Sequence, residues 1–142
     1  MTRSVPLLSA FVISALTAMP VLAGGEDDAE RAAICAEAEE RYVEMTGQAS
    51  TDAEGVTVVT MYKYNFCPAQ ITVPVGTTVR WVNVDKRTSH SVLSPDADMP
   101  ESDRAFPEEH IEFTFLVPGD QTYLCGPHWE VRDMIGMVTV EP

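Results

Sequence analysis

Residues 122–140 read Thr122-Tyr-Leu-Cys125-Gly-Pro-His128-Trp-Glu-Val-Arg-Asp-Met134-Ile-Gly-Met137-Val-Thr-Val140. Two strand-like runs flank a short loop that carries a thiol, an imidazole and a thioether, and Pro127 stiffens this loop by fixing its own backbone φ angle. Met134 falls on the same alternating face as two valines expected in the core, whereas Met137 falls on the opposite face. The stretch therefore predicts a loop between the last two strands whose donor side chains point inward.

A second imidazole lies far upstream at His90, between the strand-like run at residues 79–84 and the short apolar run Val92-Leu93. Two His, one Cys and a weakly bonding Met form the donor set of a blue-copper electron-transfer site. With the loop residues, His90 completes such a set with no spare member. We therefore predict one type 1 copper ion held by His90, Cys125, His128 and Met134.

The first 23 residues are typical of an export signal. Arg3 forms the positive n-region, an apolar run follows from Val5 to Ala18, and the small residues of Val21-Leu22-Ala23 precede a cleavage site near Ala23. An uncleaved signal anchor is the alternative, although the apolar run is short for a membrane span. No later stretch is apolar enough to span a bilayer, so we expect a soluble periplasmic protein with no stable membrane insertion after cleavage.

Three cysteines occur in the chain. In an exported protein the natural arrangement is one disulfide and one thiol kept for chemistry. Because Cys125 has the metal-ligand context, we predict a disulfide between Cys35 and Cys67. A free Cys35, or one paired between molecules, is the alternative.

A helix is predicted over residues 26–46, which contain many Ala and Glu residues and no Pro or Gly. The run stops at Gly47, a residue suited to a helix C-terminus. Ile34, Ala38 and Tyr42 form a modest apolar stripe at four-residue spacing. We therefore expect the helix to pack on the main domain.

Composition changes after residues 48–55, which are small and polar as in a linker. We assign residues 24–55 to the helix and linker and residues 56–142 to one larger domain. Seven strands are expected in that domain: Val56–Tyr64, Ile71–Val73, Thr77–Val84, Ser91–Leu93, Ile111–Val117, Gln121–Leu124 and Ile135–Glu141. Short strands with tight Pro and Gly turns predict an all-β antiparallel sandwich or Greek-key barrel, with the N-terminal α-helix as an addition.

The clearest alternation of apolar and polar residues runs from His110 to Val117. Its apolar residues are predicted to share one face: Ile111, Phe113, Phe115 and Val117. His110 then faces solvent and is a poor candidate for a buried metal ligand. The long connection at residues 94–109 holds six acidic residues, and it is either an acidic docking surface or a solvated face.

The chain is strongly acidic, with a formal net charge of −13 at pH 7. This charge argues against nucleic acid as a partner, because phosphates would be repelled. It favours a redox partner, a cytochrome or an oxidoreductase, with a basic docking surface that is attracted at long range. The alternative is that the charge only keeps an exported protein soluble.

Several segments together resemble the plastocyanin and pseudoazurin branch of the cupredoxins. They are Asn65-Phe66-Cys67-Pro68, residues 71–83, Thr88-Ser89-His90-Ser91-Val92, Cys125-Gly126-Pro127-His128 and residues 134–140. The resemblance covers residues 56–142 and implies a Greek-key β-sandwich with type 1 copper near one end. It places His90, Cys125 and His128 in the strong trigonal ligand positions and Met134 in the weak axial one.

The sequence departs from this family pattern in three places. Five residues, Trp129 to Asp133, separate the loop His from the axial Met, one more than is usual, so the axial geometry is a point to examine. Ser91 stands where the family often has Asn, which alters a contact that supports the thiolate. The N-terminal helix is not part of the standard domain.

The donor set leaves no open position for a substrate, so we interpret the protein as a one-electron shuttle and not as an enzyme. His128 is the expected electron portal, and Trp129 beside it either contacts the partner or covers the site. Two alternatives stay open: a copper chaperone or storage protein, and a copper enzyme if the longer loop pulls Met134 away. Nucleophilic catalysis by Cys125 is disfavoured because no third residue to orient a base is evident.

Overall fold

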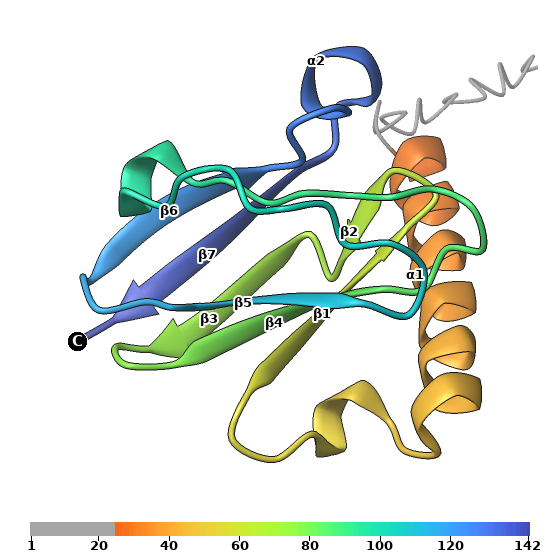
Figure 1. The fold of residues 1–142 in the computed structure, drawn as a ribbon, viewed down its shortest axis with the longest axis horizontal. Helices are drawn as coiled ribbons and strands as arrows, with labels where there is room; N and C mark the ends of the chain where they lie inside the picture. The colour runs from red at the N-terminus through yellow and green to blue at the C-terminus, as the bar shows by residue number, and fades with distance from the viewer. Residues whose placement is uncertain (1–24) are drawn as a thin grey trace, which may run out of the picture.

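Two β-sheets packed face to face form the body of the protein, as a computed structural model shows for residues 25–142 (Figure 1). The predicted export signal at residues 1–23 lies outside the described residues. The elements in chain order are α1 (Gly25–Thr46), η1 (Ser50–Asp52), β1 (Thr57–Tyr62), β2 (Asn65–Cys67), β3 (Gln70–Pro74), β4 (Thr78–Asn83), η2 (Pro95–Ala97), β5 (His110–Thr114), β6 (Gly119–Leu124), α2 (Trp129–Arg132) and β7 (Ile135–Glu141).

The strand order is β2-β1-β4-β5 in one sheet and β3-β7-β6 in the other. The β-sandwich is therefore confirmed, but the described sheets do not close into a barrel, and each contains one parallel pair, β1 with β4 and β3 with β7. The expectation of a purely antiparallel arrangement is wrong. The chain leaves the first sheet after β2, crosses to the second as β3 and returns as β4, so it runs beside β1 in the same direction.

Most of the expected strands are present, with three differences. Residues 91–93 are not a strand, because Leu93 makes only an isolated bridge to Leu124. The short strand β2 was not predicted; it follows a turn at Lys63 and Tyr64, both with left-handed backbone angles. Val117 is 66% exposed rather than in the core, because β5 ends at Thr114 and the alternation does not continue past Phe115.

The main core lies between the sheets and is built around large aromatic side chains. Trp81, Phe115, Tyr123 and Phe66 are buried there, and their rings pack edge to face at centroid distances of 4.8 to 6.2 Å. Such pairs add about 0.5–1.5 kcal/mol each beyond the apolar area they bury. Cys125 belongs to the same cluster, so the donor loop is attached directly to the main core.

The N-terminal helix α1 covers the outer face of the sheet formed by β2, β1 and β4 (Figure 1). Ala38 and Tyr42 are buried there against Val58 and Tyr62 of β1, so the predicted apolar stripe is confirmed. Helix cover explains why nearly every residue of β1 is buried, since both faces of this strand are protected.

A disulfide between Cys35 and Cys67 joins α1 to β2, as the cysteine arrangement predicted. The helix ends where expected, with Gly47 at a φ of +80°, the left-handed conformation that closes a helix C-terminus. Among residues 25–142, none of the helices has the length and apolar character to cross a membrane.

Candidate metal centre

Cys125 directly follows β6 and opens a tight turn. Its backbone carbonyl accepts hydrogen bonds from the N–H groups of His128 and Trp129, at 3.0 and 2.9 Å. Its own N–H donates to the carbonyl of Met134 at 3.1 Å, which closes the loop at its base. The turn brings the His128 Nδ1 atom to 3.3 Å from the Cys125 Sγ atom.

His90 reaches the same point from the loop after β4. Its backbone N–H and C=O both pair with Ala105, at 3.1 and 2.8 Å, so the chain is fixed on either side of the ring. The imidazole is completely buried, and its Nδ1 atom lies 3.7 Å from the Cys125 Sγ atom. Its Nε2 atom lies 2.7 Å from the carboxylate of Asp85. A carboxylate only accepts, so Nε2 carries the hydrogen and the lone pair of Nδ1 faces the sulfur.

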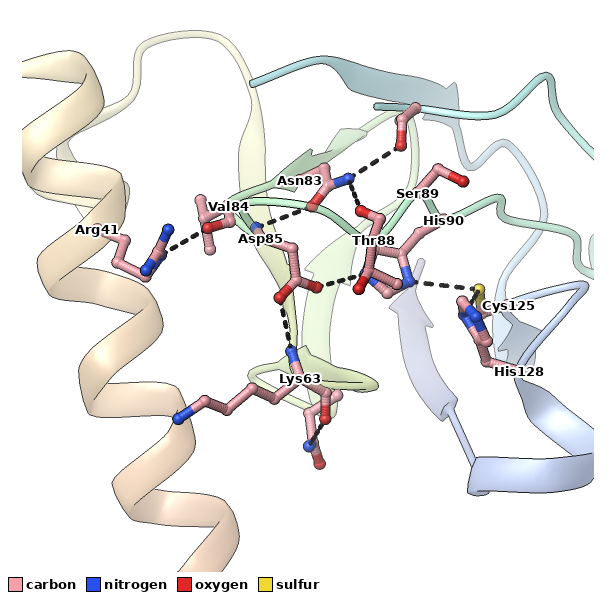
Figure 2. Close-up of polar contacts among 12 residues, drawn as sticks. Arg41, Lys63, Asn83, Val84, Asp85, Thr88, Ser89, His90, Cys125 and His128 are labelled. Atoms are coloured by element: carbon pink, nitrogen blue, oxygen red, sulfur yellow. Dashed lines mark hydrogen bonds and ion pairs between the residues drawn. The ribbon is translucent and has the colours of Figure 1, made fainter. Parts of the chain in front are cut away.

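His90, Cys125 and His128 form the one cluster of His, Cys and acidic side chains in residues 25–142 that could hold a metal ion (Figure 2). Their potential ligand atoms all lie within 4.8 Å of one another. His90 and Cys125 are buried, whereas His128 is partly exposed. The site therefore has a closed interior side and one imidazole at the surface.

Burial governs the protonation of this cluster. Desolvation raises the pKa of the Cys125 thiol, and the backbone N–H groups of Ser91 and His128 act in the opposite direction because they stabilise a thiolate. Desolvation also lowers the pKa of His128, and the neighbouring His90 adds to this effect. Without a metal the site thus favours a neutral imidazole at His128 and a protonated thiol, and a bound cation would displace the thiol proton.

Ser91, the residue after His90, links the two ligand-bearing loops. Its Oγ atom accepts a hydrogen bond from the N–H of Gly126 at 3.1 Å and donates to the carboxylate of Glu101 at 2.6 Å. Support for the thiolate loop is therefore provided by a serine and a carboxylate together. A Cβ atom at Gly126 would overlap Glu101 and press on Ser91, which explains the glycine there.

Met134 is fully buried and belongs to the same core cluster as Cys125. Residues 134, 136, 138 and 140 are all buried while Met137 is partly exposed, so the predicted alternation is confirmed. The five residues after His128 are taken up by the helical turn α2, which ends at Asp133 with a left-handed φ of 50°. The longer loop is therefore accommodated by α2, and Met134 stays in the core cluster that also contains Cys125.

The partly exposed imidazole of His128 has an aromatic neighbour, Tyr64. The Tyr64 ring packs edge to face on the imidazole, with centroids 4.9 Å apart, and the Arg132 guanidinium lies 4.8 Å from the centre of the Tyr64 ring. Trp129 is 38% exposed at the start of α2. His110 is not part of this cluster. Its side chain is 52% exposed and lies near Glu112, so the prediction that it faces solvent is confirmed.

Sequence reasoning missed Asp85 and Tyr64. Asp85 lies five residues before His90 in a segment with no periodic pattern, and Tyr64 comes from a turn whose left-handed backbone the sequence did not reveal. The only signal in the sequence was the position of Asp85 five residues before the candidate ligand His90. Carboxylates are frequent partners of metal-binding imidazoles.

The fold and the donor set define a class of protein, a β-sandwich in which residues 25–142 offer one candidate site for a soft metal ion, formed by loops. The sequence family described as copper binding proteins, plastocyanin/azurin family, matches residues 53–141. The chain belongs to this family, and the cupredoxin resemblance is confirmed. The helix α1 precedes the matched range.

Relatives agree with this assignment. The chain is similar to halocyanin from Natronomonas pharaonis, with 41% identity over 97 residues that cover 64% of this chain and 59% of halocyanin. It thus spans less than two thirds of that relative's length. Among solved structures it is similar to amicyanin, including a reduced Cu(I) form and an oxidized form of two amicyanin mutants. Each shows 28% identity over 66% of this chain and 90% of amicyanin, with a TM-score of 0.55.

The residues of this chain fit copper, the cofactor of the family. A thiol and two imidazole Nδ1 atoms converge without other hydrogen-bonding partners for those two nitrogens among the described residues. A buried thioether lies in the same cluster. Soft sulfur and imidazole donors of this kind suit copper better than hard cations.

Proposed function

We propose that the protein is a soluble one-electron carrier whose single copper ion is held by His90, Cys125 and His128, with Met134 as a weak axial donor. The observation that carries this proposal is the convergence of the two Nδ1 atoms on the Cys125 sulfur. Bound copper would supply a one-electron couple between its two oxidation states.

The role of the chain is to hold the donors still. Cys125 is fixed by the backbone bond to Met134, and His90 by the two backbone bonds to Ala105. The hydroxyl of Ser91 ties the two loops together. Fixed donors reduce the rearrangement that accompanies a change of oxidation state, and the buried side of the site leaves no approach for a substrate. These features favour a carrier over an enzyme.

Electrons would pass through the partly exposed edge of His128, with Trp129 beside it in contact with the partner. Trp129 supports this role because a substantial part of its side chain is exposed. The chain carries a formal net charge of −13, which would attract a redox protein with a basic docking surface, such as a cytochrome or an oxidoreductase. The export signal predicted at residues 1–23 would place this exchange in the periplasm.

The test is the visible and electron-spin spectrum of the copper-loaded protein. An intense blue thiolate charge-transfer band with narrow copper hyperfine splitting is expected, and a colourless or ordinary tetragonal copper spectrum would contradict the proposal. Cys125→Ser should abolish the colour. Met134→Gln should keep the colour and lower the reduction potential, and an unchanged potential would remove Met134 from the ligand set.

Copper exchange separates a carrier from a copper chaperone. A carrier with buried donors should release copper slowly to a competing chelator, because the loops must open before the ion can leave. Rapid exchange under mild conditions would contradict the carrier and favour a role in copper transfer.

A further inference from the structure

The helix α1 lies outside the matched family range, yet its Arg41 and Glu37 side chains contact Val84 and Lys63, which are neighbours of Asp85 in the structure; Figure 2 shows the Arg41 contact. We propose that Asp85 is a positioning residue for His90, and that α1 acts on the metal site by holding Asp85 in place. This inference rests on the copper site of the proposed function. It assigns a role to a helix that lies outside the residues matched by the family.

Asp85 is well placed to orient the ring. Its side chain is only 11% exposed, and its Oδ2 atom accepts the Nε2–H of His90 at 2.7 Å. Its backbone N–H donates to the Asn83 Oδ1 atom at 2.9 Å. A carboxylate on the outer nitrogen fixes the tautomer and orientation of a ligating imidazole and increases its basicity. The position of Asp85 therefore sets the direction of the His90 donor.

Asn83 closes the loop around this pair. Its Nδ2 group donates to the carbonyl of Thr88 at 2.7 Å and to that of Ala105 at 2.9 Å. Ala105 is also the backbone partner of His90. One fully buried amide thus connects the end of β4, the segment before His90 and the strand-like segment opposite it.

The first contact from α1 reaches the residue directly before Asp85. The Nε group of Arg41 donates to the carbonyl of Val84 at 2.6 Å, and the Val84 side chain is buried against α1 with Ala38 and Tyr42. The peptide that leads into Asp85 is therefore held by both a charged hydrogen bond and apolar packing.

The second contact reaches Asp85 through the turn after β1. Glu37 of α1 accepts a hydrogen bond from the Nζ group of Lys63 at 2.6 Å and another from the hydroxyl of Tyr62. The backbone N–H of Lys63 in turn points to the Asp85 Oδ1 atom at 3.4 Å. The helix thus contacts two residues that lie next to one carboxylate: Val84 through its backbone carbonyl and Lys63 through its side chain.

The alternative is that α1 only adds stability by covering an apolar sheet face. In that case any loss of helix contacts would lower the stability of the whole protein without a selective effect at His90. A local readout at the His90 ring separates the two roles, since a general loss of stability does not loosen one hydrogen bond at a temperature well below unfolding.

The experiment compares Arg41→Met with Arg31→Met. Both remove an arginine from α1, but Arg31 is exposed and has no hydrogen bond or ion pair within residues 25–142. Solvent exchange of the His90 Nε2 proton is measured by nitrogen-15 NMR at one fixed pH, in the full chain before loading and after loading with Cu(I). Asp85→Ala is the positive reference, because it removes the carboxylate that accepts the His90 proton. Asp85→Asn is a milder variant that keeps the size and shape of the side chain but removes its charge.

Asp85→Ala should speed exchange of this proton by about tenfold or more, as expected for loss of a charged hydrogen bond. Arg41→Met should speed it by a smaller factor that still exceeds the effect of Arg31→Met. In the copper-loaded protein, Asp85→Asn and Arg41→Met should both raise the reduction potential, because less negative charge is held on the ligand.

Equal exchange rates in Arg41→Met and Arg31→Met would overturn the role of α1, and an unchanged rate in Asp85→Ala would overturn the role of Asp85. The measurement before loading does not depend on the copper spectrum. A protein that fails to give blue copper but shows the expected exchange pattern would contradict the proposed function alone.

Discussion

The Ser91 hydroxyl accepts a hydrogen bond from the backbone N–H of Gly126 at 3.1 Å and so joins the two loops that carry His90 and Cys125. The same hydroxyl donates to Glu101 at 2.6 Å, and this fixes its orientation. The backbone of Ser91 also faces the Cys125 sulfur, where it favours the thiolate. One serine therefore affects both the distance between the loops and the charge on the sulfur.

Ser91→Ala should alter the copper site more than it alters the fold. The change removes an acceptor from Gly126 and a donor from Glu101, and we expect a loss of about 1–2 kcal/mol in the free energy of unfolding. The thiolate charge-transfer band should shift, because Gly126 directly follows Cys125, the proposed copper ligand. Denaturant unfolding and the visible spectrum of the copper-loaded variant measure the two effects.

Ser94→Ala is the matched control. Ser94 is also fully buried, and its hydroxyl donates to the carbonyl of Thr122 at 2.7 Å, away from the thiolate loop. Its loss should reduce stability by a similar amount and leave the spectrum unchanged. Equal spectral shifts in the two variants would show that the effect comes from general loosening and not from the Ser91 link.

The sequence allowed prediction of the features that depend on regular patterns. Met134 could be placed because it directly precedes β7, a regular strand whose alternation extends back to this residue. The same argument failed for Val117, because β5 ends three residues earlier and the backbone turns. Alternation is reliable only while the strand continues, and the sequence does not mark where β5 stops.

Contacts made by loops and turns could not be predicted in the same way. Asp85 contacts His90 because the loop after β4 folds back over five residues, and Tyr64 reaches His128 from the turn before β2, in the other sheet. Neither contact produces a periodic pattern in the amino-acid sequence from which it could be predicted. The Cys35–Cys67 disulfide was predicted only because Cys125 was assigned to the metal site first.

Removal of the Cys35–Cys67 disulfide should weaken the fold and spare the metal site. The bridge joins residues 32 positions apart, and closing a loop of that size stabilises the folded state by about 3–4 kcal/mol in the chain-entropy model. A Cys35→Ala, Cys67→Ala double variant should therefore unfold at lower denaturant concentration while it still binds copper through Cys125. Loss of the blue band in this variant at low temperature would contradict that separation.

Tyr64→Ala should make copper easier to remove. The Tyr64 ring supports the exposed imidazole of His128 by an edge contact with centroids 4.9 Å apart. An aromatic contact of this kind corresponds to a change of about two- to tenfold in an equilibrium. We expect copper transfer to a chelator to be faster by a factor in this range. Tyr64→Phe keeps the ring and should transfer copper at the rate of the unchanged protein, and a fast rate there would point to the hydroxyl instead.

The contact between Glu37 and Lys63 predicts a pH-dependent contribution to stability. The hydrogen bond from Lys63 holds the pKa of Glu37 below its ordinary value of 4.5, and the Tyr62 hydroxyl acts in the same direction. A lowered pKa in the folded state means that the stabilisation is complete above the unfolded-state pKa and is lost as the pH falls through the folded-state value. Glu37→Gln should therefore lower the melting temperature at pH 6–7.

The difference in melting temperature between the two proteins should shrink steadily below pH 4.5, because the unchanged protein then loses its own Glu37 charge. Glu40→Gln is the control, since Glu40 is an exposed residue of the same helix with no ion pair in the described part of the chain. Its effect should stay small and show no such convergence. The Glu37 and Lys63 side chains are each about half exposed, so added salt should also reduce the Glu37→Gln effect at neutral pH. A difference that persists unchanged at pH 3 would show that Glu37 stabilises the helix by packing and not by its charge.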